Sequence, residues 1–216
     1  AASSEDWDPA ATARLAQLAE NRWVGVNCGI MDQMISAVGE RGHAVLIDCR
    51  DLSLDPIPLP DDLAIVVVHS GMARTLAGSQ YAERRAACER VAARLGVQAL
   101  RDATAEQVAE DPRARHVVSE NARVLAAARA LADGDTETLG RLLRESHASL
   151  RDDYEVSTPE LDALVEALEA AGAIGARLTG AGFGGCVVAL APREDAEGIA
   201  ADAAERYRAR TGLEPR

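Results

Sequence analysis

The sequence predicts an α+β fold, in which strands and helices occupy separate stretches of the chain. Short apolar, β-branched runs occur in the first third of the 216 residues and again near the end, whereas residues 81–171 are rich in Ala, Leu, Arg and Glu. The last two strand candidates follow each other through a glycine-rich bend, without the long crossover that parallel strands need. We therefore expect separate helical and antiparallel parts, not a doubly wound sheet.

The first part of the chain predicts two helices. Residues 8–21 place apolar residues at helical spacing, and Pro9 falls in the first turn, where proline is tolerated. A turn containing Gly29 follows. The apolar spacing from Ile30 onward predicts a second, short helix that ends near Gly39.

Two strands are expected next. Residues 43–49 and 63–69 are apolar and rich in β-branched side chains. Three prolines between them, Pro56, Pro58 and Pro60, indicate a connector, because proline donates no backbone hydrogen bond to a sheet. We expect the two strands to be neighbours in one sheet.

The middle of the chain predicts about five helices, separated by helix-breaking residues. These are Gly96, Asp111-Pro112, Gly134 and Ser157-Thr158-Pro159. Thr158 followed by Pro159 is typical of a helix start, so a helix should run from there to about residue 171. Residues 174–179 and 186–190 predict two strands, and residues 194–210 a last amphipathic helix.

The charge composition excludes several functions. There are 23 basic and 35 acidic residues, which gives a net charge of −12, so neither nucleic acid nor an anionic membrane surface is an expected partner. All of the basic residues are arginines. Without lysine the chain cannot form a P-loop, a Schiff base or the lysine site of a protein kinase.

The four cysteines predict no zinc site. Cys28, Cys49, Cys88 and Cys186 are widely spaced, and no pair forms a Cys-x-x-Cys motif. Free, buried thiols are typical of the reducing cytoplasm, which is the expected location. No apolar run is long enough to cross a bilayer, so no membrane partner is expected.

A glycine-rich loop, residues 180–185, is the first candidate site. Gly180, Gly182 and Gly185 satisfy the pattern Gly-x-Gly-x-x-Gly, and Gly184 adds a fourth glycine. The loop leads into a strand, whereas a dinucleotide-binding loop leads into a helix. Either the loop is a tight connection that needs positive φ, or its bare backbone lets an anionic group such as phosphate approach closely.

Asp32 is the second candidate. It falls in the first turn of the short helix, in an otherwise apolar run, where the helix dipole keeps a carboxylate ionised. It could act as a base or a ligand, or it could be a dipole partner only. Gly29, three residues earlier, would let a substrate approach the backbone.

The helical block contains weaker candidates. Tyr81 begins a charged helix and could be a half-buried anchor. His116, His147 and the cluster at residues 151–155 are expected to form helix caps and ion pairs.

Six stretches together resemble the galactokinases, a family of the GHMP small-molecule kinase superfamily. They are residues 24–33, 47–50, 81–85, 115–121, 146–157 and 175–186. The resemblance implies ATP- and Mg²⁺-dependent phosphorylation of the anomeric hydroxyl of D-galactose. It also implies that Asp32 is catalytic and faces the sugar O1, that Gly29 and Tyr81 line the sugar pocket, and that Gly180, Gly182, Gly184 and Gly185 lie beside the nucleotide phosphates.

Two motifs of that family are missing from the chain. Its sugar-recognition motif and its Ser- and Gly-rich ATP loop would both precede residue 1, so no metal ligand is expected here. The resemblance therefore implies a fragment with an incomplete GHMP-kinase fold: residues 1–72 would be a remnant of the N-terminal domain, and residues 73–216 a helical block with a ferredoxin-like C-terminal domain. We expect the fragment alone to be inactive and to self-associate, and the full-length enzyme to be a monomer.

Two alternatives remain open at the level of sequence. One is a non-catalytic regulator that responds to galactose and ATP on the same fold. The other is a sister kinase for N-acetylgalactosamine or another sugar.

Overall fold

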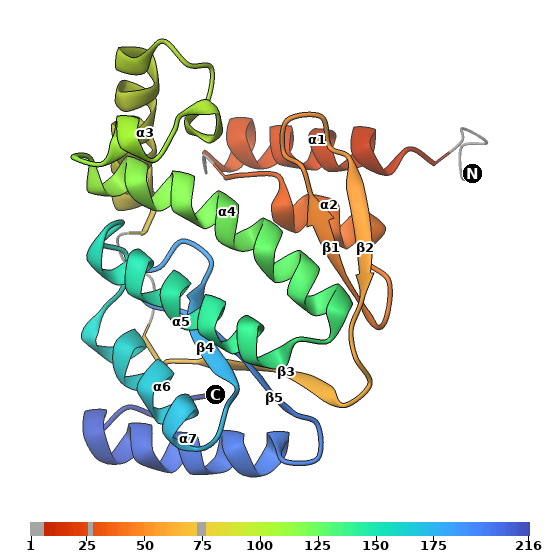
Figure 1. Ribbon diagram of the computed structural model, residues 1–216, viewed down its shortest axis with the longest axis vertical. Coiled ribbons are helices and arrows are strands. Elements are labelled where there is room, and N and C mark those ends of the chain that lie inside the picture. The colour runs from red at the N-terminus through yellow and green to blue at the C-terminus, as the bar shows by residue number, and fades with distance from the viewer. Residues whose placement is uncertain (1–6, 26–27, 73–76) are drawn as a thin grey trace. The chain divides into compact units, whose positions relative to one another are not determined.

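The computed structural model describes residues 7–25, 28–72 and 77–216 (Figure 1). The chain divides into two compact units, Ala1–Leu59 and Pro60–Arg216. The α+β expectation is confirmed, because both helices and antiparallel strands occur in each unit.

The first unit contains two helices and a two-stranded β-hairpin. Its elements are α1 (Pro9–Ala19), the π-helical turn η1 (Glu20–Val24), α2 (Met31–Val38), β1 (His43–Ile47) and β2 (Leu54–Pro58). The Asp8 carboxylate caps α1 by accepting a hydrogen bond from the Ala11 N–H at 3.0 Å. Ala13, Ile30 and Met34 form a small buried core between the helices.

The proline-rich connector is instead a strand. β2 pairs with β1 in antiparallel register, with Pro56 opposite Val45 and Pro58 opposite His43. Proline is tolerated in this position because β2 is an edge strand, whose second side needs no hydrogen-bond donor. The prediction of a connector was therefore wrong.

The second unit is built on a three-stranded antiparallel sheet. Its strands are β3 (Leu63–His69), β4 (Gly175–Thr179) and β5 (Cys186–Pro192), in the order β3-β5-β4. The expectation that residues 43–49 and 63–69 are neighbours is wrong: β3 pairs with β5, from Leu63 opposite Pro192 to His69 opposite Cys186. The expected domain boundary after residue 72 stays a prediction, although the compact units divide before β3.

Five helices complete the second unit. They are α3 (Ala77–Leu95), α4 (Pro112–Asp133), α5 (Thr136–Asp152), α6 (Pro159–Ala170) and α7 (Ala196–Thr211). Two short 3₁₀ turns, Leu100–Asp102 and Glu106–Val108, replace the fifth helix expected before residue 171. The helix-breaking residues act as predicted: Gly134 ends α4 with a φ of +70°, and the Thr158 hydroxyl caps α6 by accepting from the Leu161 N–H at 3.3 Å.

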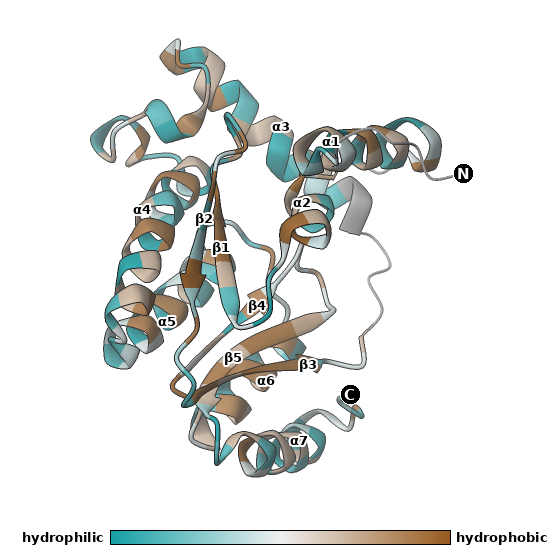
Figure 2. Cartoon of the chain, turned by 90° about the vertical axis from the view of Figure 1, so that its right-hand side faces the viewer, coloured by the Kyte–Doolittle hydropathy of each residue, from teal (hydrophilic) through white to brown (hydrophobic). Residues whose placement is uncertain are grey.

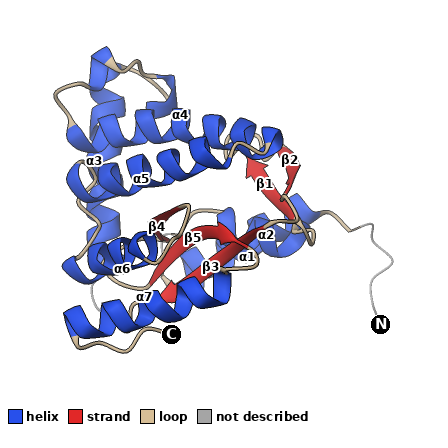
Figure 3. Cartoon of the chain, turned by 60° about the horizontal axis from the view of Figure 1, so that its bottom comes forward, coloured by secondary structure: helices blue, strands red, loops and turns tan. Residues whose placement is uncertain are grey.

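Helices α6 and α7 cover one face of this sheet (Figure 3). Figure 2 shows β3 and β5 as largely hydrophobic strands. Leu164 and Leu168 of α6 and Tyr207 of α7 are fully buried with Val187 of β5 in one continuous core. The Tyr207 hydroxyl donates to the Ser70 carbonyl at 2.7 Å, which ties α7 to the end of β3.

Helix α5 lies along β4 and makes hydrogen bonds to the backbone of this strand and of the residue before it. His147 accepts a hydrogen bond from the Leu178 N–H at 3.4 Å, and Arg144 donates to the Ile174 carbonyl at 2.8 Å. The backbones meet without side chains where Gly140 of α5 faces Gly175 of β4. A covered edge cannot pair with another chain.

Two further expectations concern the cysteines and membranes. All four cysteines are free, as predicted, but Cys49 is exposed and the other three are half-buried, so the prediction that they are buried was wrong. Among the described residues, no helix is long and apolar enough to cross a membrane.

We predict that Gly140→Ala destabilises the second unit, whereas Gly198→Ala does not. A Cβ at Gly140 would lie 2.2 Å from the Ile174 carbonyl oxygen, and backbone on both sides leaves little freedom to move. The expected loss is about 1–3 kcal/mol in the free energy of unfolding. Gly198, on α7, has open space around it, so alanine should stabilise by about 0.5 kcal/mol. Urea titrations followed by circular dichroism measure both, and equal effects would contradict the packing argument.

Candidate active site

The loop between β4 and β5 has a backbone conformation that glycine adopts far more readily than other residues. Gly180, Gly182, Gly184 and Gly185 have φ angles of +79°, +79°, +114° and +86°. Phe183, between them, also has a positive φ of +58°, which is uncommon for a residue with a bulky side chain. The four glycines are therefore explained first by the loop's own geometry.

Gly182 has a second structural reason. A Cβ at this position would lie 2.2 Å from the carbonyl oxygen of Val156, in the segment that joins α5 to α6. The same carbonyl accepts a hydrogen bond from the Phe183 N–H at 2.8 Å. Of the two interpretations left open by the sequence, the positive φ agrees with a tight connection, and at Gly182 the close neighbour is the protein itself.

Part of the loop's backbone remains able to bind an anion. The N–H groups of Phe183 and Gly185 donate to the carbonyls of Val156 and Met72. No hydrogen bond to a described residue is found for the N–H groups of Ala181 and Gly184, whereas that of Gly182 lies at the end of the turn formed by residues 180–181. The free N–H groups are separated along the chain by bonded ones, so each could donate to an anion singly.

The segment that carries Gly29 is held by the end of α1. Asn21 accepts a hydrogen bond from the Cys28 N–H at 3.1 Å, and Gln17 donates to the Cys28 carbonyl at 3.2 Å. The Cys28 thiol lies 3.3 Å from the Glu20 carboxylate, to which it donates. Burial and then this hydrogen bond raise the pKa of the Cys28 thiol, which stays protonated. Asn27, part of the same motif, lies outside the described residues.

Asp32 is the second residue of α2 and is exposed. Its carboxylate makes no hydrogen bond or ion pair with any other described residue; only its backbone carbonyl is used, by the Ser36 hydroxyl at 2.8 Å. The next residue, Gln33, is buried and donates to Glu20 at 2.8 Å. The helix is thus anchored on one side and presents Asp32 on the other.

Tyr81 lies in the second turn of α3 and is half-buried, as predicted for an anchoring tyrosine. Arg84 follows it by three residues, on the same side of the helix. Arg84 contacts both the segment after α5 and Phe183 of the glycine loop. Helix α3 and the glycine loop are therefore joined within one compact unit.

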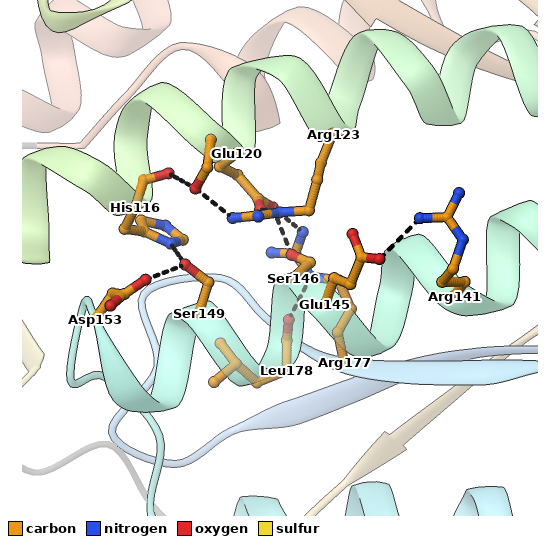
Figure 4. Close-up of polar contacts among 11 residues, drawn as sticks. His116, Glu120, Arg123, Arg141, Glu145, Ser146, Ser149, Asp153, Arg177 and Leu178 are labelled. Carbon is orange, nitrogen blue, oxygen red and sulfur yellow. Dashed lines mark hydrogen bonds and ion pairs between the residues drawn. The ribbon is translucent and has the colours of Figure 1, made fainter. Parts of the chain in front are cut away.

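A polar network on α4, α5 and β4 adjoins the start of the glycine loop (Figure 4). The Glu120 carboxylate accepts from the Ser146 hydroxyl at 2.5 Å, from Arg177 at 2.7 Å and from Arg123 at 2.7 Å. Burial raises the pKa of Glu120, but Arg177, Ser146 and Arg123 together outweigh it and hold that pKa below its usual value. A carboxylate with three donors is a structural anchor for β4 and a poor base.

His116 belongs to a neighbouring part of the same network (Figure 4). The Ser149 hydroxyl donates to Asp153 at 3.0 Å, so His116 Nδ1, also 3.0 Å from that hydroxyl, must be the donor to Ser149. The imidazole stacks on Tyr154, with ring centroids 4.6 Å apart. Burial lowers the pKa of His116 to about 4, so the ring is neutral at pH 7. His116 is therefore structural, but it forms neither the helix cap nor the ion pair that was expected.

The predicted site residues fall in both compact units. Gly29 and Asp32 belong to the first, whereas Tyr81 and the glycine loop belong to the second. The sequence interpretation assigned the cluster at residues 151–155 to caps and ion pairs, and it missed that Arg84 binds the backbone of this cluster. The available signal was the spacing of three residues between Tyr81 and Arg84, which places both on one helix face.

The described residues do not fit a metal site. Among residues 7–25, 28–72 and 77–216, no group of three His, Cys, Asp or Glu side chains is arranged to hold a metal ion. Asp32 alone would offer one carboxylate, so no step of the chemistry below is assigned to Mg²⁺.

Known proteins resemble this chain in sequence and in fold. Residues 127–209 match the C-terminal domain of GHMP kinases. A galactokinase from Roseiflexus sp. (strain RS-1) is 52% identical over 215 residues, which cover 93% of this chain and 55% of that protein. The crystal structure of Lactococcus lactis galactokinase complexed with galactose has 36% identity and a TM-score of 0.89, covering 98% of this chain and 59% of that one.

A more distant structure shares the fold only. Mevalonate kinase from L. major, solved in complex with R-mevalonate, is 23% identical with a TM-score of 0.63, and the match covers 93% of this chain and 55% of that one. The chain spans about half the length of the curated relatives that it matches.

We predict that His116 makes the protein less stable as the pH falls below about 6.5. The unfolded state binds a proton on this histidine near pH 6.5, whereas the folded state resists protonation until about pH 4. His116 should therefore cost at most about 2 kcal/mol of unfolding free energy between pH 7 and pH 5. Urea titrations at pH 7 and pH 5 measure the change in the free energy of unfolding between the two pH values. This change should be smaller for His116→Gln than for the unchanged protein, and the control His43→Gln should behave like the unchanged protein. An identical pH difference in all three proteins would contradict this assignment.

Proposed function

Because residues 127–209 form a GHMP kinase C-terminal domain, we propose that the protein carrying this chain is a galactokinase. It transfers the γ-phosphoryl group of ATP to the anomeric hydroxyl of D-galactose and releases galactose 1-phosphate and ADP. The observation that carries this proposal is the 52% identity to a galactokinase over 93% of the chain. The identity to a mevalonate kinase of the same fold is only 23%.

Asp32 is the residue proposed to act on the sugar hydroxyl. Its carboxylate is exposed in the first turn of α2. It can accept the O1 proton as a general base, or it can stabilise the attacking alcohol electrostatically. Gly29, exposed and without a side chain, leaves room beside it for the sugar, and Tyr81 is proposed as a further sugar contact.

The glycine loop is proposed to bind the phosphates of ATP. The N–H groups of Ala181 and Gly184 have no partner among the described residues and are suited to phosphate oxygens. Phosphoryl transfer depends mainly on position and charge, so backbone donors can contribute without a lysine. Mg²⁺, which the family implies, would add positive charge to the phosphates, but the described residues supply no ligand set for it.

The cytoplasm is the proposed location. ATP is the phosphoryl donor in this proposal, and four free thiols are typical of a reducing compartment.

We predict galactose-dependent ADP release from the gene product that contains this chain, at about 1 s⁻¹ or faster, within the usual range of enzymes. D-galactose should give a higher kcat/KM than N-acetylgalactosamine. The reverse preference would indicate the sister kinase. Binding of galactose and ATP without turnover would indicate a regulator on the same fold.

We predict that Asp32→Asn in the same protein lowers kcat about 10²–10⁴-fold if the carboxylate is a general base, with little change in ATP affinity. A fall of only a few fold would indicate that it orients the sugar. Steady-state kinetics with both substrates measure this.

The matched control is Glu137→Gln, which removes an exposed acid from the first turn of α5. This change should alter stability by about 0.3–1 kcal/mol and leave kcat unchanged. If Asp32→Asn behaves in the same way, Asp32 is only a dipole partner.

A further inference from the structure

Arg84 binds two carbonyls of a segment 70 residues away in the sequence. Its Nε donates to the Tyr154 carbonyl at 2.8 Å, and its Nη2 donates to the Glu155 carbonyl at 3.0 Å. The side chain is only 11% exposed. The Glu155 carboxylate lies 3.8 Å from Nη2, so it also supplies a nearby negative charge.

The same guanidinium lies over the glycine loop. Its central carbon is 5.7 Å from the centroid of the Phe183 ring, which is a cation–π distance. One side chain on α3 therefore contacts both the segment after α5 and the loop between β4 and β5.

Arg84 contacts two residues whose backbone conformation is unfavourable for residues other than glycine. Among the described residues, three that are not glycine have positive φ, and two of them, Glu155 at +57° and Phe183 at +58°, are contacted by Arg84. Such conformations persist only where the surroundings impose them, and they cluster at functional sites. The residue after Glu155, Val156, accepts the hydrogen bond from the Phe183 N–H and packs on Gly182.

Only an arginine can make this set of contacts. A guanidinium is planar, offers several N–H donors in a fixed fork and stacks on aromatic rings, whereas a lysine ammonium is a compact point charge. Arg84→Lys keeps the charge but loses either the second carbonyl or the position over Phe183.

We propose that Arg84 is the positioning residue of the glycine loop: it holds residues 180–185 in the conformation that receives the nucleotide phosphates. It does so from α3, one helical turn after Tyr81, so the helix proposed to contact the sugar also fixes the loop proposed to contact the phosphates. The inference about phosphates rests on the proposed function, whereas the ordering of the loop does not.

The first test needs no substrate and uses the 216-residue chain. In amide hydrogen exchange, Arg84→Lys should speed exchange of the Phe183 and Gly185 amides about tenfold or more, with little change in the core of α6. The matched control, Arg85→Lys, changes the adjacent arginine, which is more exposed and pairs with Glu89 on the helix surface. It should leave loop exchange unchanged.

Phe183→Leu is a second variant that keeps Arg84 and removes the ring beneath it. It should also speed exchange in the loop, by a smaller factor. Unchanged loop exchange in both Arg84→Lys and Phe183→Leu would overturn the proposal, and so would equal acceleration throughout the second unit, which indicates a general loss of stability.

The second test distinguishes positioning from a structural role by kinetics. In the gene product that contains this chain, Arg84→Lys should raise the KM for ATP about 5- to 10-fold and change the KM for galactose less than about twofold. Equal increases in both, or none, would overturn the nucleotide part of the inference. If the unchanged protein has no kinase activity, the proposed function fails, and the exchange experiment still decides whether Arg84 orders the loop.

Discussion

The second unit depends on backbone approaching backbone where no side chain fits. At Gly182, a Cβ would lie 2.2 Å from the Val156 carbonyl, and at Gly140 it would lie 2.2 Å from the Ile174 carbonyl. The first contact joins the glycine loop to the segment after α5, and the second brings α5 against β4. Because both ends of β4 are fixed in this way, the loop that follows β4 has a defined conformation before any ligand binds.

Hydrogen bonds from arginine side chains stabilise the segments that make these backbone contacts. Arg84 donates to two carbonyls of the segment after α5, and Arg144 donates to the Ile174 carbonyl beside Gly140. A carbonyl group that lies at a close backbone contact is shielded from water. It therefore needs a hydrogen-bond donor from the protein, and a side chain can supply one. A chain whose basic residues are all arginine has extended, multi-donor side chains for this task.

The sequence predicts those features of the fold that depend on neighbouring residues, such as the ends of helices. Thr158-Pro159 and Gly134 mark helix ends correctly because capping depends on a few neighbouring residues. It does not predict strand pairing: β3 joins β5, more than a hundred residues later, and no local signal distinguishes that partner from β1. For the candidate site, residue spacing singled out the glycine loop and Asp32, whose roles stay predictions, but the contact of Gly182 with Val156 depends on tertiary structure and could not be predicted from the loop itself.

The acidic residues of the described chain differ in what they can do chemically. Glu120 accepts three hydrogen bonds, and Asp153 accepts from both Ser149 and Arg115, so a proton added to either would displace a bound donor. Asp32 has no such donor among the described residues and is exposed at the start of a helix. A base must have a lone pair available for the substrate's proton. These two half-buried acids therefore stabilise the fold, whereas Asp32 is the carboxylate that we propose to act on the sugar hydroxyl.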